Sequence, residues 1–205
     1  MSPPSSLLRV GAAGAAGYLL GTAPSADVAA RLASGGAVDL RHAGSGNPGG
    51  ANARAVLGPR WGYAVMAADI AKAASACRVG RWLAGPTGEH LAGTAAVVGH
   101  CYPIWNGFRG GKGVGCSVGQ CLATFPVYFP IDLGVAAATA AGPWRRRAFA
   151  ATATASLAWV AAGVLWWRRG WPNGWGPRPT VGLPLAAAAS SAVIAQRFAA
   201  SRNNT

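Results

Sequence analysis

Residues 148–167, AFAATATASLAWVAAGVLWW, form an apolar stretch of 20 residues without a charged side chain. A helix needs about 20 mostly apolar residues to cross the hydrocarbon core of a bilayer. Arginines flank the stretch on both sides, at 145–147 and at 168–169. Because charged side chains stay outside the hydrocarbon region, these clusters mark the two ends of the helix. The stretch therefore predicts a membrane-spanning helix and guides the interpretation of its neighbours.

Further apolar segments of this kind lie on both sides of it. The candidate spans are residues 7–30, 61–79, 89–106, 114–125, 127–144 and 181–199. The segment 114–125 is too short to span a bilayer by itself, and Pro126 ends it. Counting it separately gives seven helices, which we prefer, and merging it with the next segment gives six. The sequence thus predicts an all-α, polytopic membrane helical bundle of about seven transmembrane helices, one of them short.

The charged residues are few and unevenly distributed. Hydrophobic residues make up 52% of the chain and charged residues 11%, whereas soluble domains carry about 25% charged residues. The net charge of +13 could suit nucleic acid, but the basic residues form short clusters between apolar segments. We therefore expect no nucleic-acid partner. An amino terminus outside the cell places most Lys and Arg residues, and both glycine-rich segments described below, in the cytoplasm.

The four cysteines do not form a recognisable ligand or disulfide pattern. Cys77, Cys101, Cys116 and Cys121 include no C-x-x-C pair, and no histidine cluster stands near them. We expect neither a metal site nor a disulfide framework, and interpret them as small apolar residues of the helices.

The first segment that could carry chemistry is Asp39–Asn52, DLRHAGSGNPGGAN. Its glycines let backbone amides turn towards one point, and such nests bind anions. Arg41 and Arg54 could grip a phosphate bidentately. Ser45, Asn47 and Asn52 add polar groups. The segment predicts a phosphate site, and a flexible cytoplasmic loop remains the alternative.

The second segment is Gly107–Val114, GFRGGKGV, which His100 precedes. Glycine amides, a cation and the start of a helix together favour phosphate. The segment is not a Walker A loop, because Asn106 and Gly113 stand where that pattern needs Gly and Ser or Thr. His100 could contact phosphate or accept a proton, or it could pack and cap a carbonyl. The candidate phosphate ligands here are Arg109, Gly110, Gly111, Lys112 and Gly113.

Two ionisable residues fall inside a predicted span. Asp69 and Lys72 are three positions apart, so they lie on one helix face and can form an ion pair. Charges at membrane depth face the protein interior. We predict a buried structural pair that fixes the second helix.

Several of these segments, in this order, resemble the motifs of the bacterial acyl-phosphate:glycerol-3-phosphate acyltransferases. The resemblance covers roughly residues 18–120. Tyr18–Pro24 is similar to that family's Y-L-x-G-S-x-P entry, Val38–Gly58 to its first motif, Asp69 and Lys72 to its D-x-x-K pair, and Leu91–Gly93, Gly99–Pro103 and Phe108–Val114 to its second motif.

The sequence departs from the family pattern at a few positions. Arg109 stands in place of a usual lysine, and Ala51 in place of a common threonine. The family's third motif, H-R-x-N, would fall on residues 201–204. Ser201 then occupies the histidine position, and no glutamate follows.

The resemblance implies transfer of an acyl group from acyl phosphate to the sn-1 hydroxyl of glycerol 3-phosphate, the first step of phospholipid biosynthesis. It implies no cofactor and no metal. The expected partners are the two substrates, membrane lipid and the enzyme that forms acyl phosphate. Residues 1–205 would form one integral membrane acyltransferase domain in the bacterial plasma membrane, with its active site facing the cytoplasm.

Under this hypothesis the candidate site residues divide into three sets. The catalytic set is Arg41, Ser45, Asn47 and His100; the phosphate-binding set is Gly110, Gly111, Lys112, Gly113, Arg109, Asn52 and Arg54; and the structural pair is Asp69 and Lys72. One alternative is a catalytically silent paralogue that binds lipid phosphate or a partner. The other is a small transporter, which the near absence of further ionisable residues in the helices disfavours.

Overall fold

The computed structural model describes residues 6–143 and 147–201, and every regular element in these ranges is a helix. Predictions that concern Arg145, Arg146, Arg202 and Asn204 lie outside the described residues. The helices are α1 (Ser6–Gly21), α2 (Ser25–Ser34), α3 (Gly50–Leu57), α4 (Pro59–Cys101), α5 (Val114–Thr124), α6 (Phe129–Ala141), α7 (Arg147–Arg169) and α8 (Gly182–Ala200), with a 3-10 turn at Ile104–Asn106. The predicted all-α class is therefore confirmed for this part of the chain.

Helix α4 is a hairpin of two arms rather than one straight rod. The dihedral angles leave the helical region at Ala84 and at Gly85, whose φ is +62°. Gly80 and Gly88 face each other across the hairpin, because a Cβ on either would collide with the other's carbonyl oxygen. The arms correspond to the predicted second and third spans, although the second arm ends at Cys101 and not at residue 106. The connection is shorter than predicted because these glycines let the arms approach closely near the turn.

The first predicted span, residues 7–30, is wrong as a continuous helix. Helix α1 ends at Gly21, and Pro24 caps the start of the separate helix α2. The stretch between the first two predicted spans, residues 31–60, contains the short helix α3. Helix α1 packs closely along the second arm of α4, where a Cβ on Gly17 or Gly21 would meet the backbone of Ala92 or Ala96.

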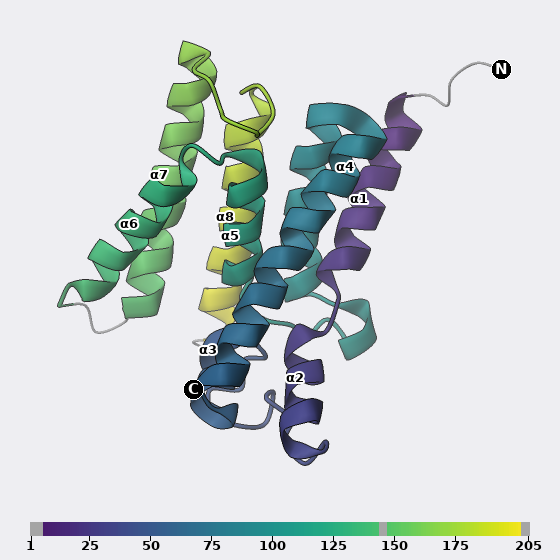
Figure 1. The fold of residues 1–205 in the computed structure, drawn as a ribbon, viewed down its shortest axis with the longest axis vertical. Coiled ribbons are helices and arrows are strands. Elements are labelled where there is room, and N and C mark those ends of the chain that lie inside the picture. Colours follow the sequence, from purple (N-terminus) through teal and green to yellow (C-terminus); the bar gives the residue numbers. More distant parts are fainter. Residues whose placement is uncertain (1–5, 144–146, 202–205) are drawn as a thin grey trace.

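The remaining helices complete the bundle. Helices α5, α6, α7 and α8 follow the predicted segments, with α6 shorter than predicted. By length and hydropathy, α7 and α8 are the two described helices that could each cross a membrane. Figure 1 shows α1, α4, α5, α6, α7 and α8 along the long axis of the molecule.

Helices α2 and α3 lie at one end of this bundle (Figure 1). A buried apolar cluster joins them to the start of α4; its members are Ala26, Ala29, Ala30, Leu40, Ala53 and Val65. Leu40 anchors the loop 35–49 in this cluster, since its side chain is almost fully buried. The fold thereby holds the first glycine-rich segment against the end of the bundle, where the second one, residues 102–113, also lies.

Candidate functional site

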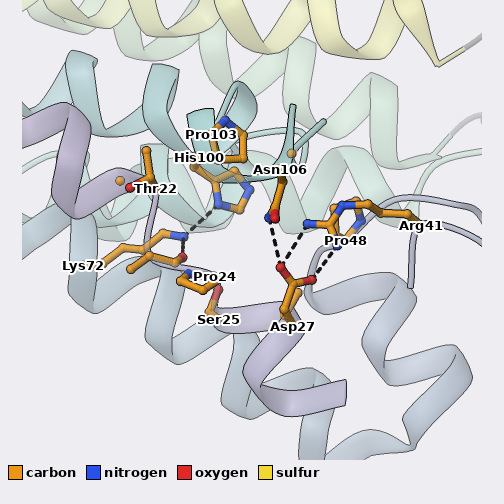
Figure 2. Close-up of a pocket in the computed structure, with 15 residues that line it drawn as sticks. Thr22, Pro24, Ser25, Asp27, Arg41, Pro48, Lys72, His100, Pro103 and Asn106 are labelled. Atoms are coloured by element: carbon orange, nitrogen blue, oxygen red, sulfur yellow. Dashed lines mark hydrogen bonds and ion pairs between the residues drawn. The ribbon is translucent and has the colours of Figure 1, made fainter. Parts of the chain in front are cut away.

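A polar pocket forms at this end of the bundle, where segments distant in sequence meet. Its polar lining comes from the α1–α2 junction, the loop 35–49, both arms of α4 and the loop after α4 (Figure 2). The side chains leave only about 20 Å³ between them, roughly room for one water molecule. A larger ligand would therefore have to replace some of the internal contacts described below.

Arg41 is the guanidinium of this pocket, and it grips a carboxylate. Its Nη1 and Nη2 donate to the two oxygens of Asp27 at 2.6 and 3.0 Å, and its Nε donates to the carbonyl of Arg109 at 3.0 Å. The hydrogen bond to Asp27 raises the pKa of Arg41. Asn106 Nδ2 also donates to Asp27, at 3.0 Å (Figure 2). This bidentate geometry is the one that arginine uses for phosphate as well as for carboxylate.

Asp69 and Lys72 form the buried ion pair that their spacing predicts. Lys72 Nζ lies 2.8 Å from Asp69 Oδ1, and both side chains are less than a tenth exposed. The ammonium also lies 2.9 Å from the carbonyl oxygen of Ala23 and 3.0 Å from Nδ1 of His100 (Figure 2). Ser25 donates to Asp69 at 2.5 Å. This network ties the two arms of α4 to the start of α2 and fixes the His100 ring at the pocket wall.

Cys116 joins this network in a way that the sequence does not reveal. Asp69, His100 and Cys116 each place one potential metal-ligand atom within 4.8 Å of the others. Lys72 Nζ already contacts both Asp69 and His100. The positive charge that balances the carboxylate is therefore supplied by a side chain, and we assign no metal to this cluster.

Asn52 holds the first glycine-rich loop together instead of facing the pocket. Its Nδ2 donates to the carbonyls of Leu40 and Ala43 at 3.0 and 2.9 Å, and its Oδ1 accepts the amide of Ser45 at 2.8 Å. The residue is buried, and both polar atoms of its side chain have partners. Asn52 therefore does not line the pocket, and its predicted contact with phosphate stays a prediction.

The other candidates from the first segment lie outside the pocket lining. The side chain of Ser45 is exposed, Asn47 is half-buried in the same loop, and Arg54 is exposed on α3. Of the predicted residues in this segment, the structure thus brings Arg41 alone into the pocket wall.

The second segment is also built differently from the predicted cradle of free amides. The amides of Gly110 and Gly111 donate to the carbonyls of Cys101 and His100, each at 3.1 Å. These two amides therefore already have backbone partners, and their predicted role as phosphate ligands stays a prediction. Glycine is required at both positions because a Cβ would collide with His100.

Arg197 of α8 clasps this segment, a role that sequence reasoning missed. Its Nε donates to the carbonyl of Gly111 at 3.0 Å and its Nη2 to that of Gly110 at 2.6 Å. The only local signal is a basic residue in the last turn of α8. That position suits a helix C-terminus and says nothing of a contact with a loop 86 residues away in sequence.

Lys112 and Arg197 form a second cationic group beside the loop. The Lys112 ammonium lies 4.6 Å from the Phe198 ring centre. Burial, and then the charge of Arg197, lower the pKa of Lys112. Within residues 6–143 and 147–201, neither cation forms an ion pair with a carboxylate. Two cations held together in this way favour an anion between them. Arg109 contributes its carbonyl to Arg41, while its own side chain is exposed.

An apolar groove adjoins the polar pocket. It encloses about 340 Å³ between α2 and the first arm of α4, and its apolar lining includes Val28, Leu32, Trp61 and Ala68. The groove and the pocket share Ala23, Pro24, Ser25 and Lys72. A ligand with an anionic head and a long apolar tail could therefore occupy both together.

The chain is similar to known proteins that all share one family description. A family model described as glycerol-3-phosphate acyltransferase matches residues 12–203. A glycerol-3-phosphate acyltransferase of Jannaschia sp. is 37% identical over 163 residues, which cover 78% of each chain. One of Maricaulis maris is 39% identical over 166 residues, covering 80% of this chain and 74% of the relative. For one of Anaeromyxobacter sp., 44% identical, the match covers 57% of the relative, so the chain spans little more than half of some of its curated relatives.

A solved structure shares the fold. The crystal structure of PlsY (YgiH), an integral membrane glycerol 3-phosphate acyltransferase in its glycerol 3-phosphate form, superposes with a TM-score of 0.74 at 29% identity, covering 98% of this chain and 91% of that one. Its lysophosphatidic acid form gives a TM-score of 0.73 at 26% identity. The helical bundle described above is therefore that of an integral membrane protein.

Proposed function

The chain belongs to the glycerol-3-phosphate acyltransferase family, and from this membership we propose that it transfers an acyl group from acyl phosphate to the sn-1 hydroxyl of glycerol 3-phosphate. The observation that carries the proposal is the pairing of two cationic groups at one end of the bundle, around Arg41 and around Lys112, with an apolar groove beside the first. Both substrates are phosphates, and one of them has an acyl tail.

We assign the acyl phosphate to the Arg41 side. Its phosphate would replace Asp27 on Arg41, and its tail would lie in the groove between α2 and α4. Ser45 and Asn47 belong to the same loop as Arg41, and would close on the phosphate from the aqueous side. Hydrogen-bond donors aimed at the reacting carbonyl oxygen are worth about 3–4 kcal/mol each.

We assign the phosphate of glycerol 3-phosphate to Lys112 and Arg197. Gly113, in a left-handed conformation with φ of +86°, is the N-cap of α5, and the first amides of that helix would favour an anion there. Gly110 and Gly111 shape this site through their contacts with His100 and Arg197. Arg54 and Arg109, both exposed, would add positive charge near the substrates without direct contact.

The main contribution of the protein to the reaction is then to position the two substrates. The sn-1 hydroxyl oxygen attacks the carbonyl carbon of acyl phosphate, the new ester C–O bond forms, and the C–O bond to phosphate breaks. The hydroxyl proton passes to the departing phosphate, whose oxygens are basic enough to accept it. Holding two reactants in contact can supply about 7–11 kcal/mol of the barrier. His100, fixed by Asp69 and Lys72, would contact a substrate phosphate from the pocket wall.

The same proposal fixes the orientation. In this proposal α1, the two arms of α4, α5, α6, α7 and α8 run alternately through the bundle, although α5 alone is too short to cross the hydrocarbon core, and the amino terminus lies outside. The pocket end of the bundle would face the cytoplasm of the bacterial plasma membrane. The enzyme that forms acyl phosphate is the expected supplier of the donor. We treat residues 1–205 as one acyltransferase domain.

One observation favours a silent paralogue that keeps its phosphate sites. Ser201 stands at the histidine position of the family's third motif, and its hydroxyl donates to the carbonyl of Phe198 at 2.9 Å, which caps α8. A serine used in this way cannot replace an imidazole as a base. The catalytic proposal therefore requires that the substrate phosphate accepts the proton.

The test is transfer of a labelled acyl group from acyl phosphate to glycerol 3-phosphate by the purified protein in lipid. We expect lysophosphatidic acid as product, and a loss of roughly 100-fold in Lys112→Ala. Arg9→Ala, which removes an exposed cation on α1, is the control and should keep its activity. No product from folded protein that still binds glycerol 3-phosphate would establish the silent paralogue.

The groove makes a second prediction, about chain length. Ala68→Trp should fill the groove and shift the preference towards shorter acyl phosphates, because Ala68 lines it. Ala67→Trp is the matched control, since Ala67 is exposed but does not line the groove. Rates with acyl phosphates of graded length would show the shift. If both variants showed the same dependence of rate on chain length, the assignment of the acyl tail to this groove would be wrong.

A further inference from the structure

The loop after α4 exposes three large apolar side chains. Ile104, Trp105 and Phe108 are 50%, 67% and 54% exposed, and they lie within a stretch of five residues. Phe108 also has φ of +61°, a region that bulky residues rarely adopt. Its amide donates to the carbonyl of Pro103 at 2.9 Å, which holds it there. Strain of this kind persists where the surrounding structure, and usually a function, requires it.

This exposed cluster continues the apolar surface of α1. The Trp105 indole donates to the hydroxyl of Thr22 at 2.9 Å, so the ring lies beside the end of α1. One turn earlier, Leu19 is 54% exposed. Tryptophan is enriched where a membrane protein leaves the hydrocarbon, because its ring is apolar and its N–H needs a polar partner. The exposed Arg109 follows directly, placed to meet lipid phosphate.

The same loop contacts the polar pocket. Trp105 holds Thr22, Asn106 donates to Asp27, and the carbonyl of Arg109 accepts from Arg41. Thr22, Asp27 and Arg41 all line the pocket. Any change in the position of the loop would therefore reach the guanidinium that we assign to the acyl phosphate.

We propose that residues 104–108 insert into the boundary between headgroups and acyl chains of the cytoplasmic leaflet, and that this lipid contact holds the pocket at the membrane surface. The assignment to the cytoplasmic leaflet rests on the proposed function, whereas the contact with lipid does not depend on it. Lipid is the occupant that fits, because the cluster is continuous with α1. A stable protein interface needs about 800 Å² on each partner, more than three side chains provide.

Fluorescence quenching tests the contact without any activity. The native cysteines are all buried, so Ile104→Cys can be labelled selectively with an environment-sensitive fluorophore. His42→Cys is the control, in a loop where the His42 side chain is 73% exposed. In vesicles whose lipids carry bromine high in the acyl chains, we expect strong quenching at position 104 and little at 42. Absence of quenching at 104 would overturn the proposal and point to a protein partner.

A second experiment measures how loss of this lipid contact affects turnover. The double variant Ile104→Asn/Phe108→Asn keeps Trp105 and Asn106, and therefore the contacts with Thr22 and Asp27. We expect the KM for long-chain acyl phosphate in vesicles to rise roughly tenfold, since two apolar anchors are lost. Val181→Asn, an exposed apolar position before α8, should leave it unchanged. An unchanged KM in the double variant would contradict the functional part, while quenching alone would still establish the contact.

Discussion

Arg41→Lys should lower kcat/KM for acyl transfer by roughly 100- to 1,000-fold while leaving the fold intact. Lysine keeps the charge but offers a single ammonium in place of the planar fork that meets Asp27 with two hydrogen bonds. It also loses the third bond, from Nε to the carbonyl of Arg109. A phosphate that binds through this fork would lose both its affinity and its orientation.

The measurement is initial rates with both substrates varied, on protein in lipid. Arg54→Lys is the matched control, because Arg54 is exposed on α3 and does not line the pocket. We expect near-normal rates for this variant. Full activity in Arg41→Lys, with Arg54→Lys also active, would mean that the acyl phosphate does not depend on the fork of Arg41.

The second large effect is on stability. Lys72→Met should destabilise the protein by about 3 kcal/mol, because removing one partner of a buried pair leaves an uncompensated charge. Asp69 would keep Ser25 and His100 as neighbours, which places the expected cost near the lower end of the range for such pairs. For a chain of this length the melting temperature should fall by roughly 10 °C.

The buried thiols offer a direct readout of this unfolding. A thiol-reactive dye should report the melting temperature in detergent, since Cys77, Cys101, Cys116 and Cys121 are all fully buried. The double variant Asp69→Asn/Lys72→Met should recover part of the loss, because no charge is then left alone. Lys112→Met, which breaks no ion pair with a described residue, should change the melting temperature little. Equal melting of Lys72→Met and the unmodified protein would show that the pair contributes nothing to stability.

Helices whose position depends on local hydropathy alone can be predicted from the sequence. Helices α5, α7 and α8 follow their predicted segments closely because an apolar stretch between loops or arginines is itself the physical cause of a span. The break between α1 and α2 was missed because the prediction relied on hydropathy, and the charged residues within 7–30 are only Arg9 and Asp27. Pro24 is a local signal for a helix boundary, and the packing of α1 on α4 and the polar contacts of Thr22 and Ser25 also favour ending the helix there.

The site shows the same division between local and distant causes. Arg41, His100 and Lys72 were identifiable because their residue type and neighbours already indicate phosphate or a buried pair. Asp27 and Arg197 were not, since each contacts the loop after α4, at a residue 79 or 86 positions away in sequence. The amides of Gly110 and Gly111 illustrate what a local pattern leaves open. A glycine-rich pattern shows that the backbone can approach closely, but not which atoms it approaches.

The clamp between Arg41 and Asp27 also bears on selectivity. The Asp27 carboxylate competes with any incoming anion for the guanidinium. Because it belongs to the same chain, it does so at a high effective concentration. A fatty acid, which is itself a monovalent carboxylate, gains little by exchanging with it. A doubly charged phosphate gains more, because each added charge strengthens the bidentate pair. We therefore expect the pocket to reject free fatty acids, which are abundant in the membrane, and to admit only the activated donor.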